Sequence, residues 1–283
     1  MARELEPVAP TRQRVQSVSR ALAILREVAA AEGLTVQEIS RRVGLRPPTT
    51  YHLVHTLADE EFLVRGERGR YRLGSSVGSL AQAFRRQIAP PAHLLPHLRS
   101  VGLRTGEASH IVGWSNGEIM VLGQVPGRHP VSVTEFAVGT VGDAHARSSG
   151  KLLLAFADAE TRAEYLRLHP PRGRTLGTIV EPARLEREFL AIRERGYSVD
   201  LEEYAPGVCC LAAPVDLGDA IYSFSLLAPS ERFKRNVDDY LAVLLAAAGD
   251  ASVRTLTPSA EASTASTSSR RPRRKRLAGA EIE

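Results

Sequence analysis

The chain has 283 residues, of which 43% are hydrophobic and 24% charged, so it can form a globular core and is long enough for two domains. It has no apolar run of about 18 residues, which excludes a transmembrane helix, and its N-terminus lacks the apolar centre of a signal peptide. Residues 1–86 carry 14 basic and 9 acidic side chains, residues 87–250 carry 16 and 20, and residues 251–283 carry 7 and 3, so the basic ends favour a nucleic-acid partner.

Two short helices joined by a glycine turn are predicted within residues 35–57. Thr35 and Glu38 have the spacing of a capping box at the start of the first helix, and Gly44 suits the left-handed position that ends it. The second helix starts at a proline pair, where the missing N–H costs nothing. Its inner face carries Thr50, Leu53, Val54 and Leu57, and its outer face carries Pro48, Thr49, His52 and His55, with Tyr51 between them. This pattern is typical of a helix-turn-helix, whose second helix reads base edges in the major groove.

A β-ribbon is predicted directly after the second helix. Residues 62–65 and 70–73 are strand-like, and the turn between them contains two glycines. Arginines surround this turn, as in a wing that contacts phosphates. We therefore predict a winged helix-turn-helix over residues 15–74, with DNA contacts from Arg41, Arg46, Pro48, Thr49, Tyr51, His52, His55, Arg68 and Arg70. The alternative is a helical hairpin in a larger core, with solvated arginines.

Two further helices flank this module. Residues 15–31 form the first, with an apolar stripe that consists of Val18, Leu22, Leu25 and Ala29 and is widened by Ile24 and Val28. Residues 75–90 form a linker helix that a proline pair ends. The apolar face of the linker is a candidate dimer contact, and packing on the first helix is the alternative.

Residues 91–254 mix helices with strands that are joined as hairpins. The pair Asn116-Gly117 is a strong hairpin signal, because both residues tolerate positive φ. We expect strands over residues 108–114, 118–125, 131–136, 197–199, 208–215 and 220–227, and helices over residues 94–104, 145–157, 161–168, 182–195 and 229–248. This order predicts an α+β domain with an antiparallel sheet flanked by helices.

The two ends of the chain are predicted to be disordered. Residues 1–14 are rich in proline and charge, and residues 255–283 are of low complexity with a basic cluster at 270–276, so neither has the apolar content to fold. The tail either adds salt-sensitive, non-specific DNA affinity or is a solvated end without a dedicated role.

Other chemistries have weaker support. His145 with Ser148 and Ser149 lacks the Gly-x-Ser-x-Gly elbow of a hydrolase, so no enzymatic activity is expected. The same serine run lacks the upstream glycine spacing of a phosphate loop. The adjacent Cys209 and Cys210 do not have zinc-site spacing, so we predict neither a metal nor another cofactor. Adjacent cysteines seldom bridge to each other, which fits a reducing cytoplasm.

Six segments resemble a known family when they are taken together. They are the runs at 15–22, at 46–57 with Glu61-Phe62-Leu63, at 142–151 (GDAHARSSGK), at 195–200 (RGYSVD), at 207–215 (GVCCLAAPV) and at 224–229 (FSLLAP). The chain thereby resembles transcriptional regulators of the isocitrate lyase regulator (IclR) family. The resemblance implies a bacterial winged helix-turn-helix protein with an effector-binding domain related to the GAF fold. It also implies homodimers, often paired into homotetramers, on short palindromic operators.

Effector-binding positions follow from the same resemblance. They are Thr134, Gly142, His145, Ser148, Ser149, Asp200, Cys210 and Ser225. Hydroxyls and backbone N–H groups at a helix start suit an anion, so a carboxylate is a candidate effector. Leu227 stands where family members can have a second serine, which implies that one wall of the effector site is more apolar. His52 stands where an arginine is common, which implies a different operator.

We therefore expect a cytoplasmic, nucleoid-associated repressor that responds to a small organic metabolite. Its partners would be double-stranded operator DNA, the effector and further copies of the chain, and no membrane. The alternative is a ligand-independent DNA-binding protein whose C-terminal domain serves oligomerisation.

Overall fold

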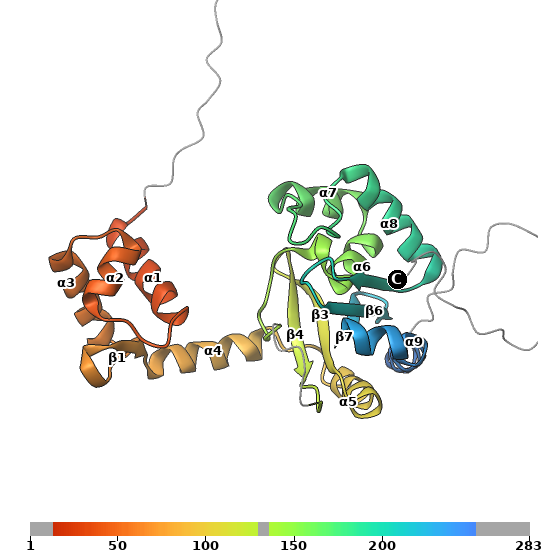
Figure 1. Cartoon of the computed structure of the whole chain (residues 1–283), viewed down its shortest axis with the longest axis horizontal. Coiled ribbons are helices and arrows are strands. Elements are labelled where there is room, and N and C mark those ends of the chain that lie inside the picture. Colours follow the sequence, from red (N-terminus) through yellow and green to blue (C-terminus); the bar gives the residue numbers. More distant parts are fainter. Residues whose placement is uncertain (1–13, 130–135, 253–283) are drawn as a thin grey trace, which may run out of the picture. The chain divides into compact units, whose positions relative to one another are not determined.

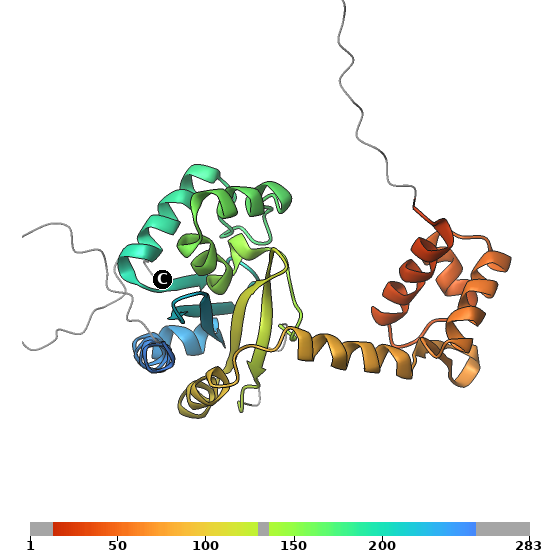
Figure 2. The same cartoon turned by 180° about the vertical axis from the view of Figure 1, so that it is seen from behind.

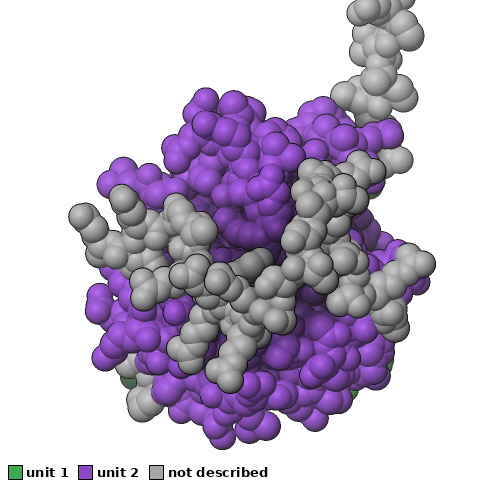
Figure 3. Space-filling view, turned by 90° about the vertical axis from the view of Figure 1, so that its right-hand side faces the viewer, with its two compact units in different colours: residues 1–86 green, residues 87–283 purple. Residues whose placement is uncertain are grey.

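The computed structural model describes residues 14–129 and 136–252. It divides into two compact units, residues 1–86 and residues 87–283, which Figure 3 colours separately. The predicted disorder of the two ends falls outside the described residues, apart from Arg14, and so does the predicted strand over residues 131–136, apart from Phe136. No helix in the described parts of the chain is long and apolar enough to cross a membrane.

Unit 1 is a winged helix-turn-helix, as predicted. Its elements are α1 (Gln16–Ala29), α2 (Val36–Val43), α3 (Pro47–Asp59), β1 (Leu63–Arg65), the 3-10 turn η1 (Glu67–Gly69), β2 (Tyr71–Leu73) and α4 (Ser75–Gln87) (Figure 1). Strands β1 and β2 pair antiparallel. The buried core consists of Ile24, Val28, Leu34, Ile39, Val54, Leu57, Leu63 and Tyr71.

Local signals in the sequence fix the turn of this motif. The Thr35 hydroxyl accepts the Glu38 N–H at 3.3 Å and the Glu38 carboxylate accepts the Thr35 N–H at 2.8 Å, which completes the predicted capping box. Gly44 ends α2 at φ 65°, in the left-handed region where a side chain would be strained. Leu34 forms a bridge to Tyr71 through two backbone hydrogen bonds. The wing is thereby tied to the loop that precedes α2.

The predicted apolar stripe on α1 is wrong in its centre. Val18 and Leu22 are 56% and 48% exposed, whereas Ile24 and Val28 are buried. Val18 with Leu22 and Ile24 with Val28 both have helical spacing. The pair that faces α2 and α3 is the one that packs into the core. The amphipathic period therefore predicted the helix and included its buried residues, but did not separate them from the exposed Val18 and Leu22.

Unit 2 is an α+β domain built on one antiparallel sheet of five strands in the order β4-β3-β7-β6-β5. The strands are β3 (Ala108–Ser115), β4 (Glu118–Val125), β5 (Ser198–Leu201), β6 (Val208–Asp216) and β7 (Ile221–Pro229). The helices are α5 (Leu94–Thr105), α6 (Ser148–Phe156), α7 (Ala159–Leu168), α8 (Pro182–Arg195) and α9 (Ser230–Ala251), and the 3-10 turn η2 (Ala144–Ala146) precedes α6. The predicted fold class is therefore confirmed.

The helices cover both faces of this sheet, as Figures 1 and 2 show. Helices α5 and α9 pack on one face, and α6 to α8 lie over the other. Successive strand residues point to opposite faces, so Cys209 and Leu211 enter the α9 core while Cys210 and Ala212 enter the α6 core. The same alternation places the side chains that form a cavity beneath α6.

Candidate functional site

The outer face of α3 presents polar and aromatic side chains to solvent. Tyr51, His52 and His55 are exposed, and the rings of Tyr51 and His55 are tilted against each other with centroids 4.4 Å apart. Inner residues Thr50 and Val54 are fully buried in the core. Packing thus fixes α3 by one side and leaves the other free, as base readout in a major groove requires.

An open groove runs between α3, the start of α2 and the wing. It is lined by Thr35, Val36, Gln37, Pro47, Pro48, Tyr51, His55, Arg65, Arg68, Gly69 and Tyr71. The structure therefore brings four predicted DNA-contact residues together: Pro48, Tyr51, His55 and Arg68. It adds Gln37 and Arg65, which the prediction omitted. Arg68 adopts φ 54° at the wing tip, next to Gly69, so the tip turns sharply and its guanidinium stays exposed.

Arg70 has an internal role in this structure. Its guanidinium donates to the Gly33 carbonyl at 2.7 Å and to the Glu38 carboxylate at 3.2 Å. The Thr35 backbone N–H, helped by Arg70, holds the pKa of Glu38 below its usual value. Arg70 thus clamps the wing to α2. The remaining predicted residues do not line the groove: Arg41, Arg46 and His52 are exposed and Thr49 is half-buried.

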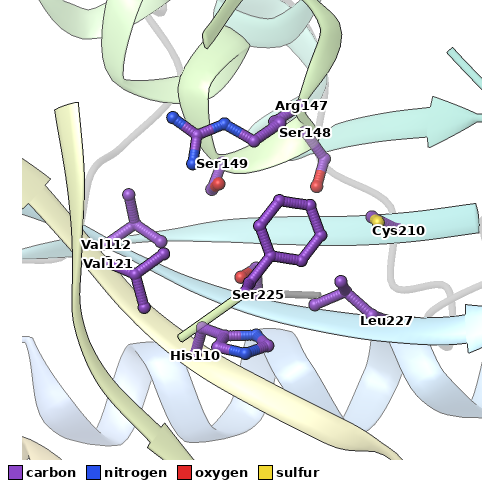
Figure 4. A pocket seen from close by; sticks show the side chains of 10 residues that line it. His110, Val112, Val121, Arg147, Ser148, Ser149, Cys210, Ser225 and Leu227 are labelled. Carbon is purple, nitrogen blue, oxygen red and sulfur yellow. The ribbon is translucent and has the colours of Figure 1, made fainter. Parts of the chain in front are cut away.

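Unit 2 contains a cavity between α6 and the sheet (Figure 4). The space open to the centre of a water-sized sphere is about 10 Å³, and the walls are formed by His110, Val112, Val121, Phe136, Arg147, Ser148, Ser149, Cys210, Ser225 and Leu227. Strand register explains the wall on the sheet side, because Val112 pairs with Val121, His110 with Ser225, and Cys210 with Leu227. In Figure 4 Arg147, Ser148 and Ser149 lie on one side of the cavity and His110 on the opposite side.

The start of α6 forms the polar side of the cavity. Ser148 and Ser149 occupy the first helical turn, where backbone N–H groups have no partner within the helix. A Cβ at Gly150 would collide with the backbone of Ala144, so glycine is required for this turn to approach η2. The serine hydroxyls and the helix N-terminus thereby lie in a site that excludes most water, which suits an anion.

Four of the eight predicted effector positions line this cavity: Ser148, Ser149, Cys210 and Ser225. Gly142 and His145 do not line it, and Thr134 lies outside the described residues. The Nε2 atom of His145 lies 2.9 Å from the Arg172 carbonyl oxygen and 3.1 Å from its backbone nitrogen. Burial lowers the pKa of His145, so the neutral ring serves to hold the loop around Arg172.

Asp200 lies one strand beyond the cavity. It pairs in register with Cys210, which stands between it and the cavity. Its Oδ1 accepts the Glu203 N–H at 2.7 Å, and the buried Lys151 ammonium pairs with the Glu203 carboxylate. Burial raises the pKa of Asp200 to about 7, and Lys151 offsets part of this effect. The Asp200, Lys151 and Glu203 cluster therefore supports the cavity wall from behind.

Sequence reasoning missed five lining residues: His110, Val112, Val121, Phe136 and Arg147. Burial lowers the pKa of His110 to about 4, so its imidazole is neutral at neutral pH. Arg147 sits at the N-cap of α6 and is 3% exposed. The sequence offered one signal for Arg147: it is the single arginine in a run of mostly small residues that leads into α6.

Comparison with known proteins gives consistent results for both units. The family profile described as "IclR helix-turn-helix domain" matches residues 17–67, and the profile described as "Bacterial transcriptional regulator IclR C-terminal" matches residues 86–253. The HTH-type transcriptional regulator BhcR of Paracoccus denitrificans is 32% identical over 221 residues, which cover 77% of this chain and 79% of BhcR. The transcriptional repressor IclR of Escherichia coli is 28% identical over 235 residues, which cover 82% of this chain and 85% of IclR.

A solved structure matches across both units. It is an IclR homologue from Microbacterium hydrocarbonoxydans complexed with 4-hydroxybenzoate, with a TM-score of 0.65 and 26% identity, covering 82% of this chain and 95% of the homologue. A winged helix-turn-helix followed by an α+β domain with a small internal cavity defines a DNA-binding transcriptional regulator with an effector-binding domain. This chain belongs to the IclR family of such regulators.

Proposed function

We propose that this protein is a repressor whose operator affinity is controlled by a small organic carboxylate bound in the unit 2 cavity. The observation that carries the proposal is the cavity itself, in which Ser148 and Ser149 present hydroxyls at the start of α6. Neither an enzymatic activity nor a cofactor belongs to this proposal. The protein would act in the cytoplasm, on the nucleoid.

Two relatives support the details of this proposal. The E. coli relative is named a transcriptional repressor, and the Microbacterium hydrocarbonoxydans homologue was solved with an aromatic carboxylate. Both share most of their length with this chain. A serine-lined helix N-terminus suits the same chemical class of ligand.

DNA would be bound by the outer face of α3 and by the wing. Tyr51, His52 and His55 would contact base edges, and Arg68 would contact phosphate. Repetition of this module on a palindromic operator requires a homodimer or a pair of dimers. The apolar Leu80 and Phe84 on α4 are 58% and 39% exposed in the single chain, which supports a dimer contact there.

Coupling between ligand and DNA would pass through the packing around Ile88, the residue that follows α4. Ile88 is buried against Met120 and Leu122, and Val138 packs on the same group. Val121, between these two β4 residues, faces the cavity and exchanges backbone hydrogen bonds with Gly139 and Thr140. A ligand that moves Val121 therefore also acts on the packing that holds the end of the linker.

Duplexes selected by the full-length protein from a random pool would provide the operator for a test. Binding of that duplex is then measured by fluorescence anisotropy at fixed salt, with and without each member of a panel of organic acids. An acid that raises the unfolding temperature should change operator affinity by roughly 5- to 150-fold, and Ser148→Val should abolish both effects. If such acids leave operator affinity unchanged, the ligand-independent alternative is correct.

A further inference from the structure

The guanidinium group of Arg147 is buried and has no carboxylate partner among the described residues. Of its five N–H groups, one has a partner in the structure: Nη2 donates to the Ile119 carbonyl at a long 3.3 Å. The Nε and Nη1 atoms are buried with no hydrogen-bond partner among the described residues. Native proteins rarely leave such groups unpaired, so a bound molecule is a candidate partner for these two nitrogens.

No carboxylate of the described residues can serve as that partner. None lies within 4.0 Å of the Arg147 guanidinium, and the carboxylate of Asp143 is held by Arg174 at 2.7 Å. Burial lowers the pKa of Arg147, yet a guanidinium keeps its proton in a protein. The cavity therefore contains a permanent positive charge that a bound anion would neutralise.

The other walls define the rest of the ligand. Val112, Val121, Phe136 and Leu227 are apolar, and the Phe136 ring lies 6.0 Å from the central carbon of the guanidinium. Arg147 is the one permanently charged side chain among the described residues that line the cavity, since His110 is neutral. A single positive charge balances a monoanion, and a phosphate dianion would leave one charge unpaired.

We propose that Arg147 binds the carboxylate of the effector and selects small monocarboxylates with a compact apolar or aromatic body. This inference rests on the proposed ligand control and adds the residue that sets its specificity. A carboxylate can bridge two guanidinium nitrogens, because Nη2 carries a second N–H beside the one given to Ile119. The serine hydroxyls at the start of α6 would complete the polar end of the site.

The test uses the full-length protein and two acid–amide pairs, benzoate with benzamide and cyclohexanecarboxylate with its carboxamide. Each pair has nearly the same shape and differs in charge. Thermal unfolding at millimolar ligand should show a higher unfolding temperature with at least one acid and no change with either amide. A site built for an ion pair rejects the neutral analogue, because the buried guanidinium is left unpaired. Equal shifts from acid and amide, or no shift from either acid, would overturn the proposal.

Variants separate a binding role from a structural one. In Arg147→Met the acid-induced shift should vanish, while the ligand-free variant should unfold at the same or a higher temperature than the wild type, because a buried unpaired charge is removed. A structural arginine would instead give a lower unfolding temperature and leave the acid response intact. Arg147→Lys keeps the positive charge but loses the planar pair of N–H donors that can bind both carboxylate oxygens, so affinity for the acid should fall about tenfold or more. Arg187→Met, on the exposed side of α8, is the matched control and should behave as the wild type.

The inference and the proposed function can fail separately. A neutral molecule that raises the unfolding temperature and changes operator affinity would overturn the role of Arg147 and the carboxylate class of the effector, and would support ligand control. An acid bound through Arg147 that leaves operator affinity unchanged would support Arg147 and contradict ligand control.

Discussion

Asp200 is a buried carboxyl group whose ionisation makes the stability of unit 2 depend on pH. Burial raises its pKa to about 7, whereas an aspartate in an unfolded chain titrates near about 3.9. The folded state therefore holds the proton more tightly, and this residue's contribution to the free energy of unfolding falls as pH rises from about 4 to about 7. Below that window the contribution is fully present.

Asp200→Asn should remove this pH dependence. The asparagine can still accept the Glu203 N–H but cannot ionise. The free energy of unfolding of the variant, relative to that of the wild type, should therefore rise by about 2–3 kcal/mol from about pH 5 to about pH 8. Chemical denaturation at a series of pH values measures the difference. Asp239→Asn, on the exposed side of α9, controls for the removal of a charge. Parallel pH profiles for wild type and Asp200→Asn would contradict the prediction.

At the residue scale, Ser148 and Ser149 were predicted from the family resemblance, and both line the cavity at the start of α6. His110 and Val121 were missed because their role depends on sheet order: β3 lies between β4 and β7, and no local pattern states this. Arg147 was missed for a different reason, because an arginine in a sequence is normally solvated and only the structure shows this one buried.

The wing is the element whose function depends most directly on charge. Arg68 is exposed at its tip, whereas Arg70 is held by Glu38 and Gly33. Arg68→Gln should weaken binding about equally for all duplexes and reduce the slope of log affinity against log salt by about 1, because the glutamine no longer neutralises a phosphate. Anisotropy titrations at several salt concentrations measure this slope, with Arg187→Gln as control. A changed sequence preference with an unchanged slope would place Arg68 on a base instead.

Val138 connects the edge of the sheet to the end of the linker helix. In Val138→Ala its packing on Ile88 is weakened, so the effector should still bind but should change operator affinity less than in the wild type. Its stability cost should be about 1 kcal/mol, because the side chain is half-buried. Calorimetry gives effector affinity and anisotropy gives the coupling. Val141→Ala, at a nearby position that is 45% exposed, should leave both unchanged, and full coupling in Val138→Ala would exclude this route.

Elements were predicted better than their orientations. The capping box and Gly44 located α2 within a residue, because caps and left-handed turns are properties of the local chain. On α1 the buried pair proved to be Ile24 and Val28 while Leu22 stayed exposed, because the choice between two apolar faces is made by distant elements. Phe136 belongs to no strand, and the rest of the run predicted as a strand, residues 131–135, lies outside the described residues.

At the scale of the whole molecule, charge and fold divide the chain in the same way. Residues 1–86 have 14 basic and 9 acidic side chains and contain the DNA-binding unit, whereas residues 87–250 have 16 and 20 and contain the cavity. The split and both fold types followed from composition and periodicity. The interior of unit 2 did not, because it is assembled from strands and a helix that are far apart in the chain.

The basic tail is the remaining charged region, with 7 basic and 3 acidic residues over 251–283. A truncation after Ser252 should leave both units folded, because the Ser252 hydroxyl still donates to Ala248 and accepts the Asp216 N–H at the end of α9. It should weaken binding to duplexes that lack an operator and reduce the salt slope by about 0.9 for each phosphate that the tail neutralises. The acid-induced rise in unfolding temperature should not change, which controls for folding. An unchanged salt slope would show that the tail binds no DNA, and that the affinity of this regulator resides in the winged unit alone.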